Sequence, residues 1–224
     1  TLIGFNQLQS QFTGATKQSL SADALKTVDA IILPIVGTQE DGLVESIFSD
    51  HPLYLKEEHL TNVPKHCVIY TGMANGYLQN LAKHAGLRVV QLLERDDVAI
   101  YNSIPTVEGA LMMAIQHTDF TIHGSHVTIL GLGRVGLSLA RTMHHLGARV
   151  KVGARNPADL ARAYEMGLFP FQLGELCEQV RDCDILFNTI PALIVTAQVI
   201  ANLPYHALII DLASKPGGVD FRYA

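Results

Sequence analysis

The chain has 224 residues, a formal net charge of −5, 48% hydrophobic residues and 17% charged residues. This composition supports a sizeable core and excludes a disordered chain, and its acidic balance argues against a general nucleic-acid-binding protein. No apolar run reaches the ~18 residues of a membrane span, and no signal peptide opens the chain, so we expect a soluble cytoplasmic protein with no membrane contact. Both ends read as parts of interrupted α/β units, so we expect the sequence to be incomplete there.

Short β-branched runs alternate with helical patterns along the whole chain. The runs expected to form strands are Ala30–Val36, Cys67–Tyr70, Leu87–Leu92, Val127–Leu130, Arg149–Val152, Asp184–Asn188 and Ala207–Leu212. The segments expected to form helices between them include Gly76–His84, Val135–Leu146, Ala158–Met166 and Ala192–Asn202. Because alternating strands and helices are typical of a parallel sheet covered on both faces, the predicted fold class is α/β with doubly wound parallel sheets.

One helical pattern interrupts this alternation. It covers about Thr106–Asp119, with Pro105 in its first turn and Glu108 near the positive end of its dipole. We interpret it as a linking helix (106–122) between a partial flavodoxin-like, substrate-side domain (1–105) and a Rossmann NADP-binding domain (123–224). The alternative is a surface helix of a single domain.

A glycine turn opens the second predicted domain. Gly131, Gly133 and Gly136 form G-x-G-x-x-G directly after an apolar strand and at the start of a helix. In this context the first glycine permits a tight turn, the second lets a pyrophosphate approach the backbone, and the third lets helix and strand pack closely. The helix amides, including that of Val135, then bind the phosphates, and Arg134 faces either the pyrophosphate or solvent. The alternative is a glycine turn kept for packing.

The end of the next strand indicates which dinucleotide binds. Arg155 and Asn156 stand where an acidic residue would hold the 2′-hydroxyl of NAD. A guanidinium instead attracts the 2′-phosphate of NADP, and the asparagine can donate a further hydrogen bond. We therefore expect NADP, with NAD as the second choice; the alternative is that Arg155 is a solvated strand-end residue.

Two later loops complete the predicted site. "NTIP" (Asn188–Pro191) and "LASKPGG" (Leu212–Gly218) follow the last two strands, and ligands of open α/β sheets bind outside the carboxyl ends of the strands. We assign Thr189 and Pro191 to the cofactor. Ser214 and Lys215 are assigned to an anionic substrate, with a solvated lysine as the alternative.

The cysteines and histidines give no metal or disulfide pattern. Cys67, Cys177 and Cys183 have no C-x-x-C spacing, and the ten histidines are scattered. We predict no metal site and three buried cysteines that act as small apolar side chains.

Several long strings resemble the A subunits of dipicolinate synthase, a family, across essentially the whole chain. They are FTGATK, HCVIYTGMANGYL, ERDDVAIYNSIPTVEGALMMAIQHTDFTIHGSHVTILGLGRVG, KVGARNPADLARAYEMGL and LIIDLASKPGGVDFRYA. More distantly, the layout is similar to that of D-2-hydroxyacid dehydrogenases. Measured against the family's pattern, an opening βα unit and a C-terminal segment are missing.

The resemblance implies a function. Such proteins bind NAD(P) and work with the flavoprotein-like B subunit of dipicolinate synthase, converting a cyclic dihydro- or hydroxytetrahydrodipicolinate into pyridine-2,6-dicarboxylate. The setting it implies is the mother-cell cytoplasm during sporulation, and we also expect a homo-oligomer. Two alternatives remain: an NADP-binding scaffold or regulatory protein without turnover, and an NADP-dependent reductase of small 2-oxo acids, for which no Arg, Glu and His set is evident.

A dicarboxylate substrate requires cations or N–H donors. Besides Ser214 and Lys215, we expect backbone amides near 71–75 and 214–218 to serve. Asn102 and Ser103, taken to lie just before the linking helix, are further substrate-binding candidates. Glu108 is a candidate base or a helix cap, and His117 and His123 are proton carriers or structural histidines.

Overall fold

The structure is a computed structural model, and it describes residues 1–8, 13–214 and 216–224. The chain divides into two compact units, Thr1–Ala99 and Ile100–Ala224. The boundary lies inside the helix α4 (Asp96–Gln116) and not at residue 105. Each unit is described by itself.

Unit 1 contains a parallel three-stranded sheet in the order β3 (Ala30–Ile32), β6 (Val68–Thr71), β7 (Arg88–Gln91). The helix α3 (Gly76–Ala85) connects β6 to β7. It is capped at its start by Asn75, whose side chain accepts a hydrogen bond from the Leu78 amide, and ends at Gly86 with φ +67°. The expected strands and helix are therefore present here; β3 and β7 are shorter than the predicted runs, and β6 is shifted by one residue.

Smaller elements complete unit 1. They are β1 (Leu2–Ile3) paired with β2 (Lys17–Gln18), β4 (Leu43–Val44) paired with β5 (Leu53–Tyr54), α1 (Ala22–Leu25), α2 (Glu57–Leu60) and the 3₁₀ turn η1 (Leu92–Glu94). Strands of two residues and helices of one turn carry no periodic signal, so the sequence did not predict them.

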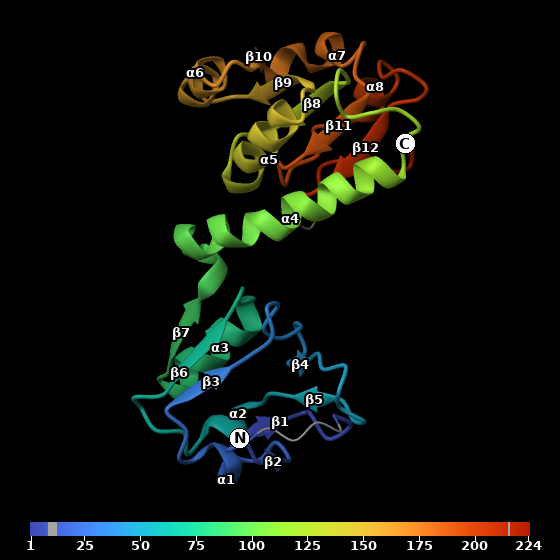
Figure 1. The fold of residues 1–224 in the computed structure, drawn as a ribbon. Helices are drawn as coiled ribbons and strands as arrows, with labels where there is room; N and C mark the ends of the chain where they lie inside the picture. Colours follow the sequence, from blue (N-terminus) through green and yellow to red (C-terminus); the bar gives the residue numbers. More distant parts are fainter. Residues whose placement is uncertain (9–12, 215) are drawn as a thin grey trace. The chain divides into compact units, whose positions relative to one another are not determined.

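Unit 2 is built on a five-stranded parallel sheet in the order β10-β9-β8-β11-β12 (Figure 1). Its strands are β8 (His126–Leu130), β9 (Arg149–Ala154), β10 (Phe169–Gln172), β11 (Ile185–Asn188) and β12 (Leu208–Asp211). Its other helices are α5 (Arg134–His145), α6 (Pro157–Glu165), α7 (Leu176–Gln179) and α8 (Ala197–Ile200), with η2 (Leu173–Glu175). Strand order reverses at β8, which is the topology of dinucleotide-binding folds.

Apolar side chains cover both faces of this sheet. Along β8, Val127 and Ile129 pack in one cluster with residues of α4, α5 and α6, whereas Leu130 belongs to a second cluster with residues of α7 and α8. Along β11, Phe187 and Leu186 divide between the clusters in the same way. Strands buried on both faces read as continuous apolar runs, which is why the sequence identified them.

The predicted linking helix was placed wrongly at its start. α4 begins at Asp96 rather than near Thr106, and Pro105 lies inside it rather than in its first turn. The start signal is the pair Asp96-Asp97, two acidic residues in the first turn; Pro105 outweighed it in the sequence argument. Val107, Ala110 and Ala114 join the core of unit 2, whereas Ile115 is 59% exposed.

Within the described ranges, α4 is also the one helix that is long and apolar enough to cross a membrane by length and composition; its mean hydropathy is 1.3. The core helix of a soluble protein can have the same length and composition, so a single such helix is weak evidence for a membrane span.

Two further differences concern unit 2. The strand β10 has no counterpart among the predicted runs, because its sequence FPFQ contains Pro170; the strand lies at the sheet edge, where proline is tolerated. The predicted helix Ala192–Asn202 is observed only over Ala197–Ile200. Residues before it cannot be helical, because Val195 pairs with Val219 in a β-bridge.

Candidate cofactor site

The glycine turn follows β8 and excludes side chains at two positions. Gly131 has φ +91°, and a Cβ on it would lie 2.7 Å from Thr189 Oγ1. A Cβ on Gly136 would lie 2.1 Å from the Gly131 carbonyl oxygen, so only glycine lets α5 pack this closely on the turn. A Cβ on Gly133, the residue before α5, would have no atom of the described residues within 4 Å. The backbone at Gly133 is therefore open to a ligand.

The first turn of α5 presents its amides beside this open position. Arg134 and Val135 are its first two residues, and the first hydrogen bond of the helix runs from the Leu137 amide to the Gly133 carbonyl, at 2.9 Å. The first N–H groups of a helix have no partner within the helix and attract phosphate. Arg134 has an interaction within the chain, so its guanidinium is not counted as a free cation.

The carboxyl end of β9 carries the two residues assigned to the ribose. Arg155 directly follows Ala154 and is exposed, and none of the described residues forms a hydrogen bond or ion pair with its side chain. Asn156 caps the start of α6, and its Oδ1 accepts a hydrogen bond from the Ala158 amide at 3.0 Å. Its Nδ2 group is the one left to donate to a ligand. An exposed guanidinium at this strand end fits an additional phosphate.

The loop after β11 lies against the glycine turn. The Thr189 hydroxyl donates to the Leu130 carbonyl at 2.8 Å, and the Thr189 amide donates to the same oxygen at 3.0 Å. Pro191, two residues on, is exposed. The structure therefore brings Thr189 beside Gly131, as the assignment to the cofactor requires.

The loop after β12 contains the residues assigned to the substrate. Ser214 is exposed, and its carbonyl accepts a hydrogen bond from the Gly217 amide at 2.9 Å. Lys215 lies outside the described residues.

Sheet order fixes how these parts are distributed. β9 and β11 flank β8 on opposite sides, and β12 lies beyond β11. Arg155 and the loops after β11 and β12 are therefore on opposite sides of the glycine turn, all at the carboxyl end of the sheet. A dinucleotide bound across the turn would have its adenosine half over β9 and its nicotinamide half over β11 and β12.

Asn188 is buried and Asp211 is half-buried; Asn188 opens the predicted loop Asn188–Pro191, but neither residue was given a role from the sequence. They end β11 and β12 in register with one another, and the Asn188 Nδ2 group donates to Asp211 Oδ1 at 2.8 Å. The available signal was a polar residue closing each of the apolar runs DILFN and LIID.

The substrate-side residues of α4 are not where the sequence placed them. Asn102 and Ser103 lie within the helix, not before it. Ser103 is 1% exposed, and its hydroxyl bonds to Ser138 of α5 at 3.1 Å, so it joins two helices of unit 2 rather than facing a ligand. Glu108 is exposed and lies well inside α4, so it cannot cap the start of this helix.

Two of the backbone amides near 71–75 already donate hydrogen bonds within unit 1. The Met73 amide donates to the Ile35 carbonyl at 2.8 Å, and the Ala74 amide donates to Gln91 Oε1 at 2.7 Å. These two donors are not available to a substrate.

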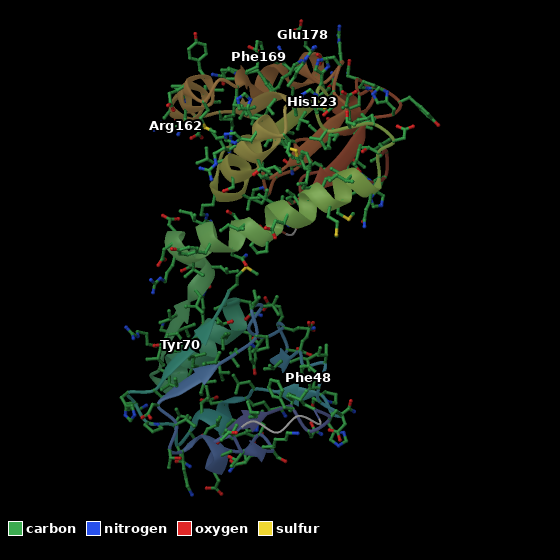
Figure 2. The ribbon with its side chains drawn as sticks, viewed as in Figure 1. Phe48, Tyr70, His123, Arg162, Phe169 and Glu178 are labelled. Atoms are coloured by element: carbon green, nitrogen blue, oxygen red, sulfur yellow. The ribbon has the colours of Figure 1, made fainter. Side chains whose placement is uncertain are left out.

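The two candidate histidines have local contacts. His117 Nδ1 lies 2.9 Å from the Met113 carbonyl at the end of α4. His123, labelled in Figure 2, lies on the loop that enters β8, at the amino end of the sheet. A Cβ on Gly147 would lie 2.3 Å from the His123 ring. The glycine turn is at the opposite end of the same strand, so His123 is poorly placed as a proton carrier at the cofactor.

The three cysteines are free. Cys67 and Cys183 are buried as expected, whereas Cys177 is only half-buried. Burial raises the pKa of Cys183 to about 11, so its thiol stays protonated at neutral pH. In the described ranges, no group of three or more His, Cys, Asp or Glu side chains is arranged to hold a metal ion.

Comparisons with known proteins agree with this geometry. Residues 1–93 match the family model described as the N-terminal domain of the dipicolinate synthase A subunit. The A subunit of dipicolinate synthase from Bacillus subtilis (strain 168) is 54% identical over 223 residues, which cover 100% of this chain and 75% of that protein. This chain belongs to the family of dipicolinate synthase A subunits.

Residues 106–214 match the family model of the D-isomer specific 2-hydroxyacid dehydrogenase NAD binding domain. The crystal structure of the dipicolinate synthase A subunit from Bacillus halodurans is 56% identical with a TM-score of 0.93, over 99% of this chain and 76% of that one. A transhydrogenase from Sinorhizobium meliloti, at 17% identity and a TM-score of 0.65 over 92% and 65% of the chains, shares the fold alone.

These findings confirm the expected family and the α/β class with its Rossmann domain. The second family model also shows a dehydrogenase-type domain, whose class of cofactor is a nicotinamide dinucleotide. The family is named for one subunit of an enzyme, and this name implies a partner subunit.

Proposed function

We propose that this chain is the NADP-binding subunit that oxidises a cyclic dihydrodipicolinate to dipicolinate, pyridine-2,6-dicarboxylate. It would act with the flavoprotein-like B subunit of dipicolinate synthase in the mother-cell cytoplasm during sporulation. The proposal rests on membership of the family and on one observation: the exposed Arg155, which has no side-chain partner among the described residues, directly follows β9, the strand beside β8 and its glycine turn. A carboxylate there would hold the 2′-hydroxyl of NAD, whereas a guanidinium favours the 2′-phosphate of NADP.

The proposed reaction balances as a two-electron oxidation. The dihydropyridine ring loses one hydride and one proton and becomes aromatic; a hydroxytetrahydro precursor first loses water to give the same dihydro ring. When bound, the cofactor accepts the hydride at its nicotinamide ring. This chain's own residues would bind the phosphates at the glycine turn and α5, and orient the nicotinamide half beside the loops after β11 and β12.

The decisive experiment combines the purified chain, its B subunit partner, NADP and the cyclic precursor, and follows absorbance of both NADPH and the pyridine product. We expect both signals to rise together, and only with the partner present. Product without NADPH would indicate a bound but unreacted cofactor, as in a scaffold. Oxidation of NADPH by simple 2-oxo acids, with the chain alone, would indicate a reductase.

We propose that Ser214 and Lys215 bind one carboxylate of the substrate, because they follow β12 closely in the sequence. Lys215→Ala should raise the KM for the cyclic dicarboxylate several-fold, because a cation is lost, and change the KM for NADP much less. Lys83→Ala, in α3 of unit 1, is the matched control. An unchanged substrate KM would contradict the assignment.

A second copy of the chain is proposed to pack on α4. Ile100, Tyr101, Ile104, Met112 and Ile115 lie on one flank of this helix within unit 2 and are each more than half exposed. Together they expose on the order of 500 Å² of apolar surface, the size of patch that is often functional in soluble proteins. A standard interface covers ~800 Å² on each partner, so flanking side chains would complete a two-fold pairing.

Sedimentation tests this pairing. The unaltered chain should sediment as a dimer at micromolar concentration, and Ile104→Arg should shift it to monomer. Gln198→Arg, a similar charge added on the exposed side of α8, should leave it dimeric. A monomer at every concentration of the unaltered chain contradicts the pairing.

A further inference from the structure

Asn188 and Asp211 form a hydrogen-bonded pair between the two loops at the carboxyl end of β11 and β12. Asn188 is 0% exposed, and both its amide nitrogen and its amide oxygen have partners. The Nδ2 group donates to Asp211 Oδ1 at 2.8 Å and to the Ile190 carbonyl at 3.0 Å, and Oδ1 accepts from the Ile190 amide at 3.1 Å. One side chain therefore sets the path of the loop after β11.

Asp211 does the same for the loop after β12. Its Oδ1 accepts a hydrogen bond from the Ala213 amide at 3.1 Å, and its Oδ2 accepts one from the Gly218 amide at 2.8 Å. Hydrogen bonds to a carboxylate are stronger than those between neutral groups. The carboxylate thus holds both ends of the turn that contains Ser214.

The two loops also touch one another at Gly218. A Cβ there would lie 2.2 Å from Asn188 Nδ2 and 2.6 Å from the Ile190 carbonyl oxygen. The Gly218 carbonyl accepts hydrogen bonds from the amides of Ile194, at 3.1 Å, and Val195, at 2.9 Å. The pair and its surroundings therefore form a tightly packed network that joins the two loops.

From this network we infer that Asn188 and Asp211 are positioning residues for the nicotinamide half of the cofactor. The inference rests on the proposed function, because it takes the loops after β11 and β12 as the border of the nicotinamide. Arg155, on the other side of the glycine turn, acts on the adenosine half. Damage to the pair should therefore affect one half of the dinucleotide and spare the other.

Two ligands separate the halves: NADPH, and 2′-phospho-ADP-ribose, which lacks the nicotinamide. Asn188→Asp replaces the donor with an acceptor facing Asp211 Oδ1 and the Ile190 carbonyl, and Asp211→Asn is the milder change. We expect each variant to raise the Kd for NADPH about tenfold and to leave the Kd for 2′-phospho-ADP-ribose within about twofold.

Asn202→Asp is the matched control. It is the same substitution in the same unit, at a residue whose Nδ2 donates to the Gln198 carbonyl within its own helical segment, and it should change neither Kd. Equal losses of both ligands in Asp211→Asn, or no loss of either, would overturn the positioning role. Failure of the unaltered chain to bind either ligand would instead overturn the proposed cofactor site, and this inference with it.

Discussion

Single glycines in the turn after β8 have different roles, and the structure separates them. Gly136 has no room for a methyl group, because its Cβ would overlap the Gly131 carbonyl oxygen, whereas a Cβ on Gly133 would meet no atom of the described residues. Gly133 also has φ −74°, a value that alanine adopts without strain. Gly136 therefore serves packing, and Gly133 keeps space for a ligand.

Alanine at these two positions should have different consequences. Gly136→Ala should lower the free energy of unfolding by about 1–3 kcal/mol, because the added methyl group forces α5 away from the turn. Gly133→Ala should leave the free energy of unfolding nearly unchanged and weaken NADPH binding at least about tenfold, because the methyl group would meet the pyrophosphate. Urea unfolding and a fluorescence titration measure the two effects. Full NADPH affinity in Gly133→Ala would contradict the assigned ligand space.

Residue types could be predicted at the cofactor half of the site because each has a fixed role in a strand-turn-helix context. Gly131 and Gly136 are tightly packed in the turn after β8, Thr189 bonds beside that turn, and Arg155 follows β9; their binding of a cofactor stays a prediction. Asn188 was placed in the predicted loop but given no role, because its contact with Asp211, 23 residues away, cannot be seen in the local sequence.

At the scale of elements, the helix α4 carries a proline where none is favoured. Pro105 has no N–H, so the Tyr101 carbonyl lacks its usual helical hydrogen bond. The Thr106 hydroxyl donates to the neighbouring Asn102 carbonyl at 3.0 Å and not to the Tyr101 carbonyl, so it does not replace the missing bond. The helix therefore tolerates the proline at a cost to stability.

Pro105→Ala should raise the free energy of unfolding by about 1–2 kcal/mol, because the missing hydrogen bond can form. Pro157→Ala, at the start of α6, should not stabilise the fold, because a first-turn N–H has no partner within the helix. Thermal unfolding of the two variants compares them directly. A loss of stability in Pro105→Ala would contradict this account of α4.

Strands that read as continuous apolar runs were predictable, including the edge strand β12, whereas strands of two residues and the proline-containing edge strand β10 were not. β8 and β11 are continuous apolar runs, whereas β10 contains Pro170 and the paired strands of unit 1 have two residues each. The start of α4 was missed because the proline was interpreted as a start signal, although the helix already runs from Asp96 to Ile104 before it.

Across unit 2, the two ends of the sheet have different roles. The carboxyl end carries the residues proposed to bind the cofactor, and the amino end carries pairs of acidic and basic side chains. There, Asp184 accepts hydrogen bonds from the His126 amide at 2.7 Å and from His206 Nε2 at 2.8 Å. Burial alone would raise the pKa of Asp184, but these hydrogen bonds outweigh it and hold the pKa below its ordinary value.

This shift predicts an acid dependence of stability. A carboxylate with a lowered folded-state pKa contributes stability above its unfolded pKa of about 4, and that contribution is lost as the pH falls through the folded pKa. The unaltered chain should therefore be more stable than Asp184→Asn at pH 7, and the difference should shrink below about pH 4. Asp119→Asn, on an exposed loop, is the control. A difference that is constant with pH would contradict the role of the charge.

The most direct test of the whole account is a fluorescence titration of the unaltered chain and of Arg155→Asp with NADPH and NADH. We predict that the unaltered chain binds NADPH more tightly than NADH. In the variant, NADPH binding should weaken at least about tenfold, because a carboxylate repels the 2′-phosphate, while NADH binding changes little. Equal losses for the two cofactors, or a preference of the unaltered chain for NADH, would contradict it.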